Sequence, residues 1–327
     1  MLKKSYAVGL VGATGLIGNK FIKIMEKRNF PVEKFKAFAS PASAGKTLSA
    51  FGKKVIVESL DENSFSGLDL VFFSAGKEIS LKFAPIAENA GAIVIDNSSA
   101  FRMNDNIPLV VPEINIDAIN LNKTRIIANP NCSTVQAVLP LKYIARTYGI
   151  KRIIYSTYQA VSGSGKKGVK DLLLTRQGFS PLYYPLPISD TCICEIGSLS
   201  DGEYTEEEIK MRCETCKILG INIPVSATCI RVPTENCHLV SVEAELNRNF
   251  ELSEIEREIA FTEGIKISDF PSAVSADGKG EVFVGRVRKS TAFENGISFI
   301  TVADNTLKGA GLNAVQIAEA LMNLNKL

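Results

Sequence analysis

The sequence of 327 residues predicts an α/β protein with two domains. Up to about residue 128, continuous apolar runs that suit buried parallel strands alternate with segments of helical spacing. From residue 151 on, longer segments alternate apolar and polar residues, as strands of an antiparallel or mixed sheet do. We therefore expect a Rossmann-type domain in residues 1–130 and an α+β domain in residues 131–307. A helix in residues 308–327 is expected to return and complete the first domain.

The expected elements follow from these patterns in chain order. In the first domain, strands are expected at 6–12, 34–40, 53–59, 68–76, 92–99 and 125–129, and helices at 19–28 and 80–91. In the second domain, strands are expected at 151–163, 227–246 and 281–290, and helices at 167–178, 205–220 and 252–261.

The composition narrows the class of protein. The net charge is +2 and no block of like charges stands out, which argues against a nucleic-acid or membrane surface. No apolar run reaches the roughly 18 residues that a membrane span requires. The start of the chain, MLKKSYAVGLVGATGLIG, is interrupted by glycines, so we interpret it as a first strand and turn rather than a secretory signal. We expect a cytosolic protein whose seven cysteines are reduced.

A glycine-rich turn directly follows the first expected strand and leads into the first expected helix. In GLVGATGLIG the glycines permit a tight turn, and backbone N–H groups at the helix start can approach a pyrophosphate. We therefore expect a dinucleotide here, held by Gly12, Thr14, Gly15, Leu16 and Ile17. The alternative is a plain strand-to-helix turn.

The end of the second expected strand indicates which dinucleotide binds. An NAD site usually has Asp or Glu at this place to hold the ribose hydroxyls. The segment FASPASAGK carries Ser40 and Ser43 but no acid. This favours NADP as the cofactor, because a carboxylate would repel its extra phosphate.

The segment NPNCST, residues 129–134, places one cysteine where a strand is expected to end and a helix to begin. A helix N-terminus stabilises anions and lowers the pKa of a thiol, and its free N–H groups can hold an oxyanion. Cys132 is therefore a candidate nucleophile, with a buried structural cysteine as the alternative. His238 is the only histidine in the sequence, so any imidazole chemistry depends on it.

NPNCST occurs in one fixed order with GATGLIG, DNSSAFR, TYQAVSGSG and a seven-residue step from Arg231 to His238. Together these motifs resemble aspartate-semialdehyde dehydrogenase, and the match runs from about residue 6 to the C-terminal helix. The resemblance implies a fold like that of glyceraldehyde-3-phosphate dehydrogenase, with the second domain serving catalysis and dimerisation. It also implies a homodimer, with a tetramer left open.

The resemblance further implies a reaction. L-4-aspartyl phosphate would be reduced by NADPH to aspartate semialdehyde with release of phosphate, on the route through diaminopimelate to lysine and to threonine, methionine and isoleucine. Cys132 would form a thioester, His238 would carry protons, and Gln159 would orient the acyl group.

The substrate and cofactor contacts come from the same resemblance. Arg231 would hold the substrate carboxylate, Glu207 its ammonium group, and Lys210 and Arg102 its phosphate. Because Glu207 and Lys210 are three residues apart on an expected helix, a solvated surface ion pair is the alternative for them. Further cofactor contacts near the nicotinamide are implied for Ser162, Gly163 and Asn305.

Two other functions stay open. Another acyl-phosphate reductase, such as that for N-acetyl-γ-glutamyl phosphate, would offer no ammonium group to Glu207. A catalytically silent NADP-binding paralogue would be expected to have lost Cys132, Gln159 or His238, and all three are present.

Two features bear on the cofactor and on metal binding. Many bacterial relatives carry an arginine where this chain has Ala42, so use of NAD is left open.

The CxC pair at 192 and 194 and the CxxC pair at 213 and 216 together offer four thiolates. The second pair falls inside an expected helix rather than on a turn, and we expect no metal.

Overall fold

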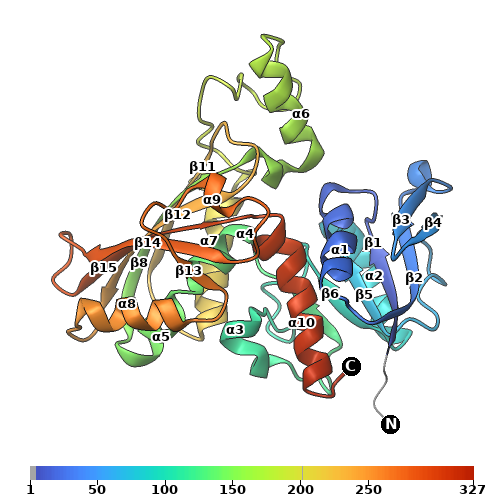
Figure 1. The fold of residues 1–327 in the computed structure, drawn as a ribbon, viewed down its shortest axis with the longest axis horizontal. Coiled ribbons are helices and arrows are strands. Elements are labelled where there is room, and N and C mark those ends of the chain that lie inside the picture. The colour runs from blue at the N-terminus through green and yellow to red at the C-terminus, as the bar shows by residue number, and fades with distance from the viewer. Residues whose placement is uncertain (1–4, 201) are drawn as a thin grey trace. The chain divides into compact units, whose positions relative to one another are not determined.

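The computed structural model describes residues 5–200 and 202–327, and the chain divides into two compact units. The first unit comprises Met1–Pro130 and Ala310–Leu327, and the second comprises Asn131–Gly309. Figure 1 shows the first unit built from both ends of the chain, in blue to green and in red, and the second from the middle. The first unit has the Rossmann-type α/β architecture and the second is α+β, so the expected fold class is confirmed.

Among the described residues, seven strands form the sheet of the first unit, in the order β3-β4-β2-β1-β5-β6-β7. Their bounds are β1 (Tyr6–Val11), β2 (Val32–Ala39), β3 (Thr47–Ala50), β4 (Lys53–Ser59), β5 (Leu70–Phe73), β6 (Ile93–Asp96) and β7 (Ile126–Ala128). Every neighbouring pair is parallel except β3–β4. All residues of β1 and β5 are buried, as the centre of a sheet covered on both faces requires.

In the part of the chain that the structure describes, this sheet is covered by the helices α1 (Leu16–Lys27), α2 (Lys77–Asn89) and α10 (Leu312–Asn323). Helix α2 packs on β5, β6 and β7, whereas α10 contacts α1 and β6. Arg28, just after α1, forms a bidentate ion pair with Glu319 of α10, with 2.7 Å in each of its two hydrogen bonds. Shorter pieces are α3 (Pro112–Asn115) and the 3₁₀ turns η1 (Pro41–Ser43) and η2 (Ile116–Ala118).

The second unit is built on a mixed sheet with the order β11-β8-β12-β15-β14-β13 in the described residues. Its strands are β8 (Ile150–Gln159), β11 (Val225–Arg231), β12 (His238–Leu246), β13 (Ile265–Ile267), β14 (Val282–Lys289) and β15 (Gly296–Ala303). The pairs β11–β8 and β13–β14 are parallel, and the other pairs are antiparallel. The segment before the sheet and the connections between its strands supply the helices.

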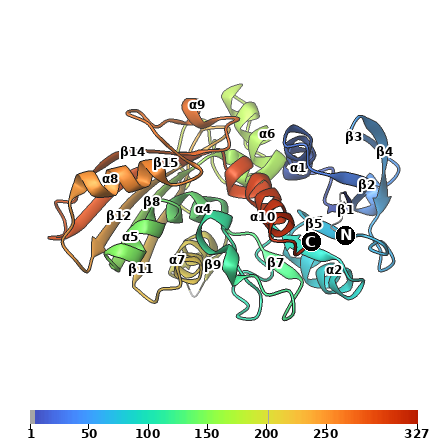
Figure 2. The same cartoon turned by 60° about the horizontal axis from the view of Figure 1, so that its bottom comes forward.

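Helices cover one face of this mixed sheet, as Figure 2 shows. They are α4 (Cys132–Val138), α5 (Leu141–Thr147), α7 (Glu206–Leu219) and α8 (Leu252–Phe261). Along β8 the side chains of Ile153 and Tyr155 are buried, whereas Ile154 and Tyr158 on the other face are 42% and 43% exposed. In the described residues this second face is exposed along β8, whereas α9 (Ala273–Ala276) packs on it near Leu239 and Val302.

The remaining elements of the second unit are short or lie in connections. They are α6 (Gly165–Arg176), α9 (Ala273–Ala276), the hairpin strands β9 (Leu199–Ser200) and β10 (Tyr204–Thr205), the 3₁₀ turn η3 (Val161–Ser164) and the π-helical turn η4 (Leu307–Gly311).

Two expectations about strands need correction. The segment 227–246 is not one strand but two, β11 and β12, and β11 pairs in parallel with β8 rather than with β12. The break falls at Pro233, which has no N–H for a ladder bond, and at Cys237, whose φ is 71°. Strand β15 was absent from the expected elements although its sequence, GISFITVA, is rich in residues that favour strands.

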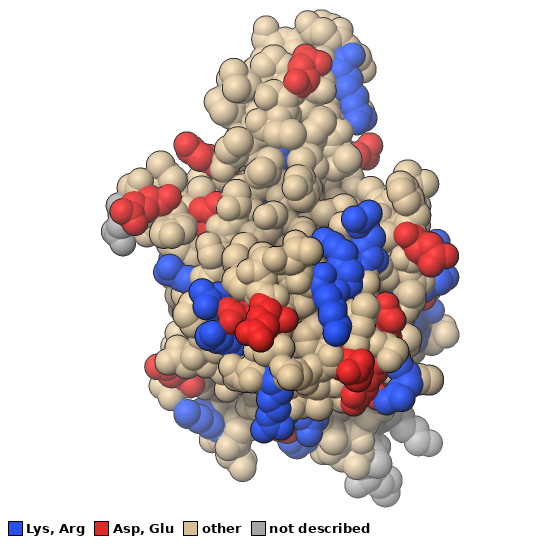
Figure 3. Space-filling model, turned by 90° about the vertical axis from the view of Figure 1, so that its left-hand side faces the viewer, with Lys and Arg blue, Asp and Glu red and all other residues tan. Residues whose placement is uncertain are grey.

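Within residues 5–200 and 202–327, no helix combines the length and the apolar character needed to cross a membrane. Figure 3 shows Lys and Arg side chains interspersed with Asp and Glu on the face that it presents.

Candidate active site

The glycine turn of the first unit has the geometry that a dinucleotide requires. Gly12 has a φ of 83°, and a Cβ there would lie 2.4 Å from the carbonyl oxygen of Ser74. A Cβ at Gly18 would lie 2.3 Å from the carbonyl oxygen of Gly12. Only glycine fits both positions, so the chain can turn tightly from β1 into α1. The residues between them that were expected to bind cofactor, Thr14, Gly15, Leu16 and Ile17, are all half-buried at this turn.

The segment after β2 is an exposed 3₁₀ turn. Ser40 and Ala42 are exposed there and Ser43 is half-buried. The ammonium group of Lys46 donates to the Ser43 hydroxyl at 3.4 Å. A hydroxyl and a cation thus lie together at the place where the sequence predicts the 2′-phosphate of NADP.

Arg102 is the one predicted substrate residue that belongs to the first unit. Its side chain is buried, and its guanidinium donates to the carbonyl oxygens of Asn97 at 2.8 Å and Asn129 at 2.9 Å. These carbonyls follow β6 and β7, so the strand ends fix the direction of the guanidinium.

In the second unit, Cys132 is the first residue of α4 and is partly exposed. Asn131 caps the helix, because its side-chain oxygen accepts the N–H groups of Ser133 at 2.9 Å and Thr134 at 3.3 Å. A Cβ at Gly309, in the turn η4, would lie only 2.7 Å from Cβ of Cys132. The position of Cys132, the candidate nucleophile, is therefore fixed on one side by the Asn131 cap. On another side it is fixed by Gly309, which packs so closely that no side chain would fit there.

Helix α7 contacts this turn through two buried carboxylates. Glu207 accepts from the side-chain amide of Asn131 at 2.8 Å, and Glu214 accepts from the backbone N–H of Asn131 at 2.6 Å. Glu207 also pairs with Lys210 at 3.4 Å. Because Glu207 is only 7% exposed and contacts the residue before Cys132, the pair is not a solvated surface ion pair.

His238 begins β12 and is fully buried. Its Nδ1 accepts the backbone N–H of Ala160 at 3.0 Å, and its Nε2 has no hydrogen-bond partner among the described residues. A Cβ at Gly163 would lie 3.2 Å from this Nε2 and 2.7 Å from Nη1 of Arg231. Burial, and secondly the charge of Arg231, lower the pKa of His238 well below its ordinary value, while a backbone contact with Cys237 opposes them.

Strand pairing brings two further predicted residues, Gln159 and Arg231, to the ends of neighbouring strands. Gln159, the last residue of β8, lies opposite Arg231, the last residue of β11. Both are buried, and Nη1 of Arg231 donates to the carbonyl oxygen of Ala160 at 2.8 Å. The Gln159 side chain donates to the hydroxyl of Thr157 at 3.2 Å.

Ser162 and Asn305 form a hydrogen-bond network with the backbone of Cys237, the residue before His238. The amide of Asn305 donates to the hydroxyl of Ser162 at 3.0 Å, and its oxygen accepts the backbone N–H of Cys237 at 3.0 Å. Cys237 is a buried non-glycine residue with a φ of 71°, an uncommon conformation that clusters at functional sites. Asn305, predicted to contact the cofactor, thus also holds the backbone beside the histidine.

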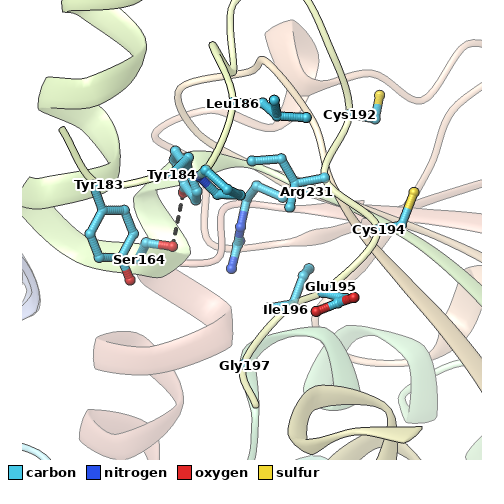
Figure 4. A pocket seen from close by; sticks show the side chains of 12 residues that line it. Ser164, Tyr183, Tyr184, Leu186, Cys192, Cys194, Glu195, Ile196, Gly197 and Arg231 are labelled. Atoms are coloured by element: carbon cyan, nitrogen blue, oxygen red, sulfur yellow. Dashed lines mark hydrogen bonds between the residues drawn. The ribbon is translucent and has the colours of Figure 1, made fainter. Parts of the chain in front are cut away.

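Arg231 also lines a cavity of about 620 Å³, shown in Figure 4. Its walls include Ser164, Tyr184, Cys192, Cys194 and Glu195. The Tyr184 hydroxyl donates to Ser164 at 2.9 Å. The two cysteines of the CxC pair are exposed at this cavity, whereas Cys213 and Cys216 lie on α7. In the part of the chain that the structure describes, no group of three or more His, Cys, Asp or Glu side chains is arranged to hold a metal ion.

Several residues of this site were not singled out in the sequence. Asn131, Ala160, Glu214 and Gly309 contact the predicted residues directly. Asn131 carried a signal, because asparagine before a helix is a preferred cap. Glu214 follows Glu207 by seven residues and so shares its helix face. Nothing local marked Ala160, whose contribution is a backbone N–H.

Comparisons with known proteins identify the family of the chain. Residues 7–122 match the family described as semialdehyde dehydrogenase, NAD binding domain, and residues 141–308 match semialdehyde dehydrogenase, dimerisation domain. The chain is 44% identical to aspartate-semialdehyde dehydrogenase of Aquifex aeolicus, over 97% of this chain and 98% of that protein. The chain belongs to the aspartate-semialdehyde dehydrogenase family.

Solved structures of this family share the fold closely. Aspartate semialdehyde dehydrogenase II from Vibrio cholerae is 42% identical and superposes with a TM-score of 0.94, covering 98% of this chain and 99% of that chain. The same Vibrio cholerae enzyme in complex with ASA gives a TM-score of 0.94 at 41% identity, with the same coverage.

Proposed function

We propose that this protein catalyses the NADPH-dependent reductive dephosphorylation of L-4-aspartyl phosphate to aspartate semialdehyde. The observation that carries the proposal is a pair of clusters in the second unit: Cys132 and Glu207 around the Asn131 cap, and His238 and Arg231 around Gly163. Family membership and a relative solved in complex with ASA support the choice of substrate. The aldehyde produced supplies the synthesis of lysine, by way of diaminopimelate, and of threonine, methionine and isoleucine.

The charges of the site match the charges of aspartyl phosphate. Arg231 presents a guanidinium that suits the α-carboxylate, and Glu207 presents a buried carboxylate that suits the α-ammonium group. Lys210 and Arg102 supply cations for the phosphate. An N-acetylated substrate has no ammonium group and would leave the Glu207 carboxylate without its ligand, which favours the aspartyl substrate over the N-acetylglutamyl one.

Cys132 acts as the nucleophile of this reaction. Its thiolate forms a C–S bond to the acyl carbon while the bond from that carbon to the phosphate oxygen breaks, which leaves a thioester and free phosphate. The Asn131 cap and the close approach of Gly309 hold the sulfur in one direction, so attack requires little reorganisation. Gln159 orients the acyl group, and His238 faces it through Nε2.

NADP fits the first unit, and when bound it supplies or accepts the hydride. Gly12, Thr14, Gly15, Leu16 and Ile17 would hold its pyrophosphate at the start of α1. Further contacts would come from Ser40 and Ser43 in the first unit and from Ser162, Gly163 and Asn305 in the second. Because Ala42 stands where an arginine could meet the 2′-phosphate, we propose NADP as the preferred cofactor with NAD also accepted.

We further propose that the protein is a cytosolic homodimer. The second unit matches a family model described as a dimerisation domain, and one face of its sheet is exposed along β8, where it carries Ile154 and Tyr158. All seven cysteines lie in the described part of the chain and are thiols outside any disulfide there, which supports a reducing compartment.

A phosphate-dependent assay tests the proposed activity. Purified protein is incubated with aspartate semialdehyde, phosphate and NADP or NAD, and the formation of reduced cofactor is followed. We expect a signal that requires phosphate and is lost in Cys132→Ala. Cys213→Ala is the matched control, because this cysteine is also half-buried and belongs to the same unit. Its activity should equal that of the unchanged protein.

Two results would contradict the proposal. Greater activity with N-acetylglutamate semialdehyde would assign the protein to another acyl-phosphate reductase. Cofactor binding without turnover of either aldehyde would identify a silent paralogue.

A further inference from the structure

Helix α7 contacts the segment around Cys132 with one of its faces. This face carries three residues at helical spacing: Glu207, Met211 and Glu214. None of them is more than 7% exposed. Each accepts a hydrogen bond from this segment, the two carboxylates from Asn131 and the Met211 sulfur from the hydroxyl of Thr134 at 3.4 Å. The start of α4 is therefore held by side chains of a second helix.

Glu214 accepts the main-chain N–H of Asn131, with 2.6 Å between nitrogen and oxygen. Asn131 is the N-cap of α4, and the N–H of an N-cap is commonly accepted by Glu or Gln at the third helical position, which completes a capping box. Helix α7 has such a box between Thr205 and Glu208. In α4 the third position is Thr134, which is neither Glu nor Gln. Glu214 therefore supplies from another helix the acceptor that the sequence of α4 does not provide.

The burial of Glu214 makes this contact costly to form and fixes its direction. Only 1% of the residue is exposed, and a buried carboxylate is unfavourable unless hydrogen bonds compensate it. A distance of 2.6 Å is short for an N–H donor, as is usual where the acceptor is ionised. Helix α7 is also fixed at both ends, by its capping box and by Gly220 in the left-handed conformation at its C-terminus. The acceptor oxygen is thus presented from a rigid element.

Asn131 is held at three of its atoms. Its main-chain nitrogen donates to Glu214, its side-chain nitrogen donates to Glu207 at 2.8 Å, and its side-chain oxygen accepts two N–H groups at the start of α4. Because Cys132 follows directly, a rotation of the main chain that redirects its side chain would break at least one of these hydrogen bonds. On the other side, Gly309 already packs closely against Cβ of Cys132. The direction of the sulfur therefore depends on the contacts of Asn131.

We infer that Glu214 is a positioning residue for Cys132, on which it acts through the main-chain N–H of Asn131. The kinetic part of this inference rests on the proposed function. Glu207 also contacts Asn131, but it is the proposed partner of the substrate ammonium group and so shares its oxygens with a ligand. Glu214 keeps the turn in place while Glu207 engages the substrate. Loss of the Glu214 acceptor should therefore lower kcat, because attack by the sulfur depends on its direction, whereas loss of Glu207 raises KM.

NMR can observe this hydrogen bond in isolation, because Pro130–Asn131 is the only Pro–Asn pair in the sequence. The full chain is made with ¹³C-carbonyl proline and ¹⁵N-asparagine, so that a triple-resonance spectrum contains a single signal, that of the Asn131 amide. We expect a low-field proton that exchanges slowly with deuterated solvent, as a short hydrogen bond to a buried carboxylate requires. Rapid exchange, or a proton at the position of a solvated amide, would overturn the inference without reference to turnover.

Two substitutions separate the acceptor from the charge of Glu214. Glu214→Gln removes the charge and keeps an acceptor oxygen at the same reach, whereas Glu214→Asp keeps the charge and withdraws the acceptor by one methylene. We expect Glu214→Gln to retain the slowly exchanging Asn131 amide and a kcat within about threefold of the unchanged protein. Glu214→Asp should speed this exchange by about tenfold or more and lower kcat by about 10²-fold, with KM for aspartate semialdehyde within about threefold. Equal kcat values in the two variants would refute the positioning role, and so would the reverse order, which would show that Glu214 acts through its charge.

Thr215→Val is the matched control for a general disturbance of α7. Thr215 is also fully buried and follows Glu214, but its hydroxyl donates to the hydroxyl of Tyr155 in β8 at 3.3 Å. The Asn131 signal and the kcat of this variant should equal those of the unchanged protein, and a loss as large as that of Glu214→Asp would refute a specific role of Glu214. If the unchanged protein does not turn over aspartate semialdehyde, the proposed function fails, while the Asn131 signal in the three variants still decides whether Glu214 fixes the turn.

Discussion

The buried neutral imidazole of His238 makes the stability of the second unit depend on pH. In the unfolded chain a histidine has a pKa near 6.5, whereas burial and Arg231 lower the pKa in the folded protein well below that value. The folded state therefore binds fewer protons than the unfolded state below pH 6.5. The contribution to stability is fully present above the unfolded pKa and is lost as the pH falls toward the folded pKa.

The magnitude follows from this linkage. Each pH unit between the two pKa values costs about 1.4 kcal/mol, so acidification from pH 7.5 to 5.0 lowers the free energy of unfolding by about 2 kcal/mol if the ring stays neutral. His238 is fully buried, so solvent screening does not reduce this value. His238→Gln should lack this loss, and groups that titrate in both proteins, such as Asp96 with its raised pKa, cancel in the comparison.

Hydrogen exchange across a urea series measures this effect. The amides of β12 report the unfolding free energy of the unit that contains His238, separately from the first unit. The difference between the two pH values should be about 2 kcal/mol larger for the unchanged protein than for His238→Gln. An equal pH dependence in both proteins would refute a neutral buried imidazole.

Three further substitutions test the site. Gly163→Ala places a methyl group 2.7 Å from Nη1 of Arg231. Steady-state kinetics should therefore show a fall of about 10²-fold in kcat/KM. A kcat/KM equal to that of the unchanged protein would contradict the close packing. Glu207→Gln removes the proposed partner of the substrate ammonium group and should raise KM for aspartate semialdehyde by about tenfold or more. Glu206 is exposed, so the control Glu206→Gln should leave this KM unchanged. Equal effects of the two substitutions on KM would refute the assignment of Glu207. Ala42→Arg adds a cation for the 2′-phosphate and should raise the ratio of kcat/KM with NADP to kcat/KM with NAD by about tenfold. An unchanged ratio would mean that the 2′-phosphate binds elsewhere.

The parts of the site that the sequence predicts are those whose geometry is local. The glycine turn is such a case, because the steric need at Gly12 and Gly18 arises within one strand, one turn and one helix. The turn before Cys132 is another, since Asn131 caps the helix that follows it directly. The glycine turn and the helix start at Cys132 were predicted from residue type and spacing, whereas the capping role of Asn131 was not.

The contacts that could not be predicted from the sequence join residues that are far apart in the chain. Glu214 accepts from Asn131 across 83 residues, and His238 accepts from Ala160 across 78 residues. Each uses a backbone N–H, which every residue except proline possesses, so the residue type carries no signal. The division of 227–246 into β11 and β12 has a similar origin, because β11 is aligned by β8 and not by its neighbour in sequence.

The central claim is that Cys132 carries the acyl group, and trapping that intermediate tests it most directly. The protein is mixed with aspartate semialdehyde and NADP in the absence of phosphate, quenched in acid, digested and analysed by mass spectrometry. We predict that the peptide containing Cys132 gains the mass of one aspartyl residue, that the gain disappears on addition of phosphate, and that Cys132→Ala shows none. An unmodified Cys132 peptide in a protein that produces reduced cofactor, or the adduct on another residue, would contradict the account.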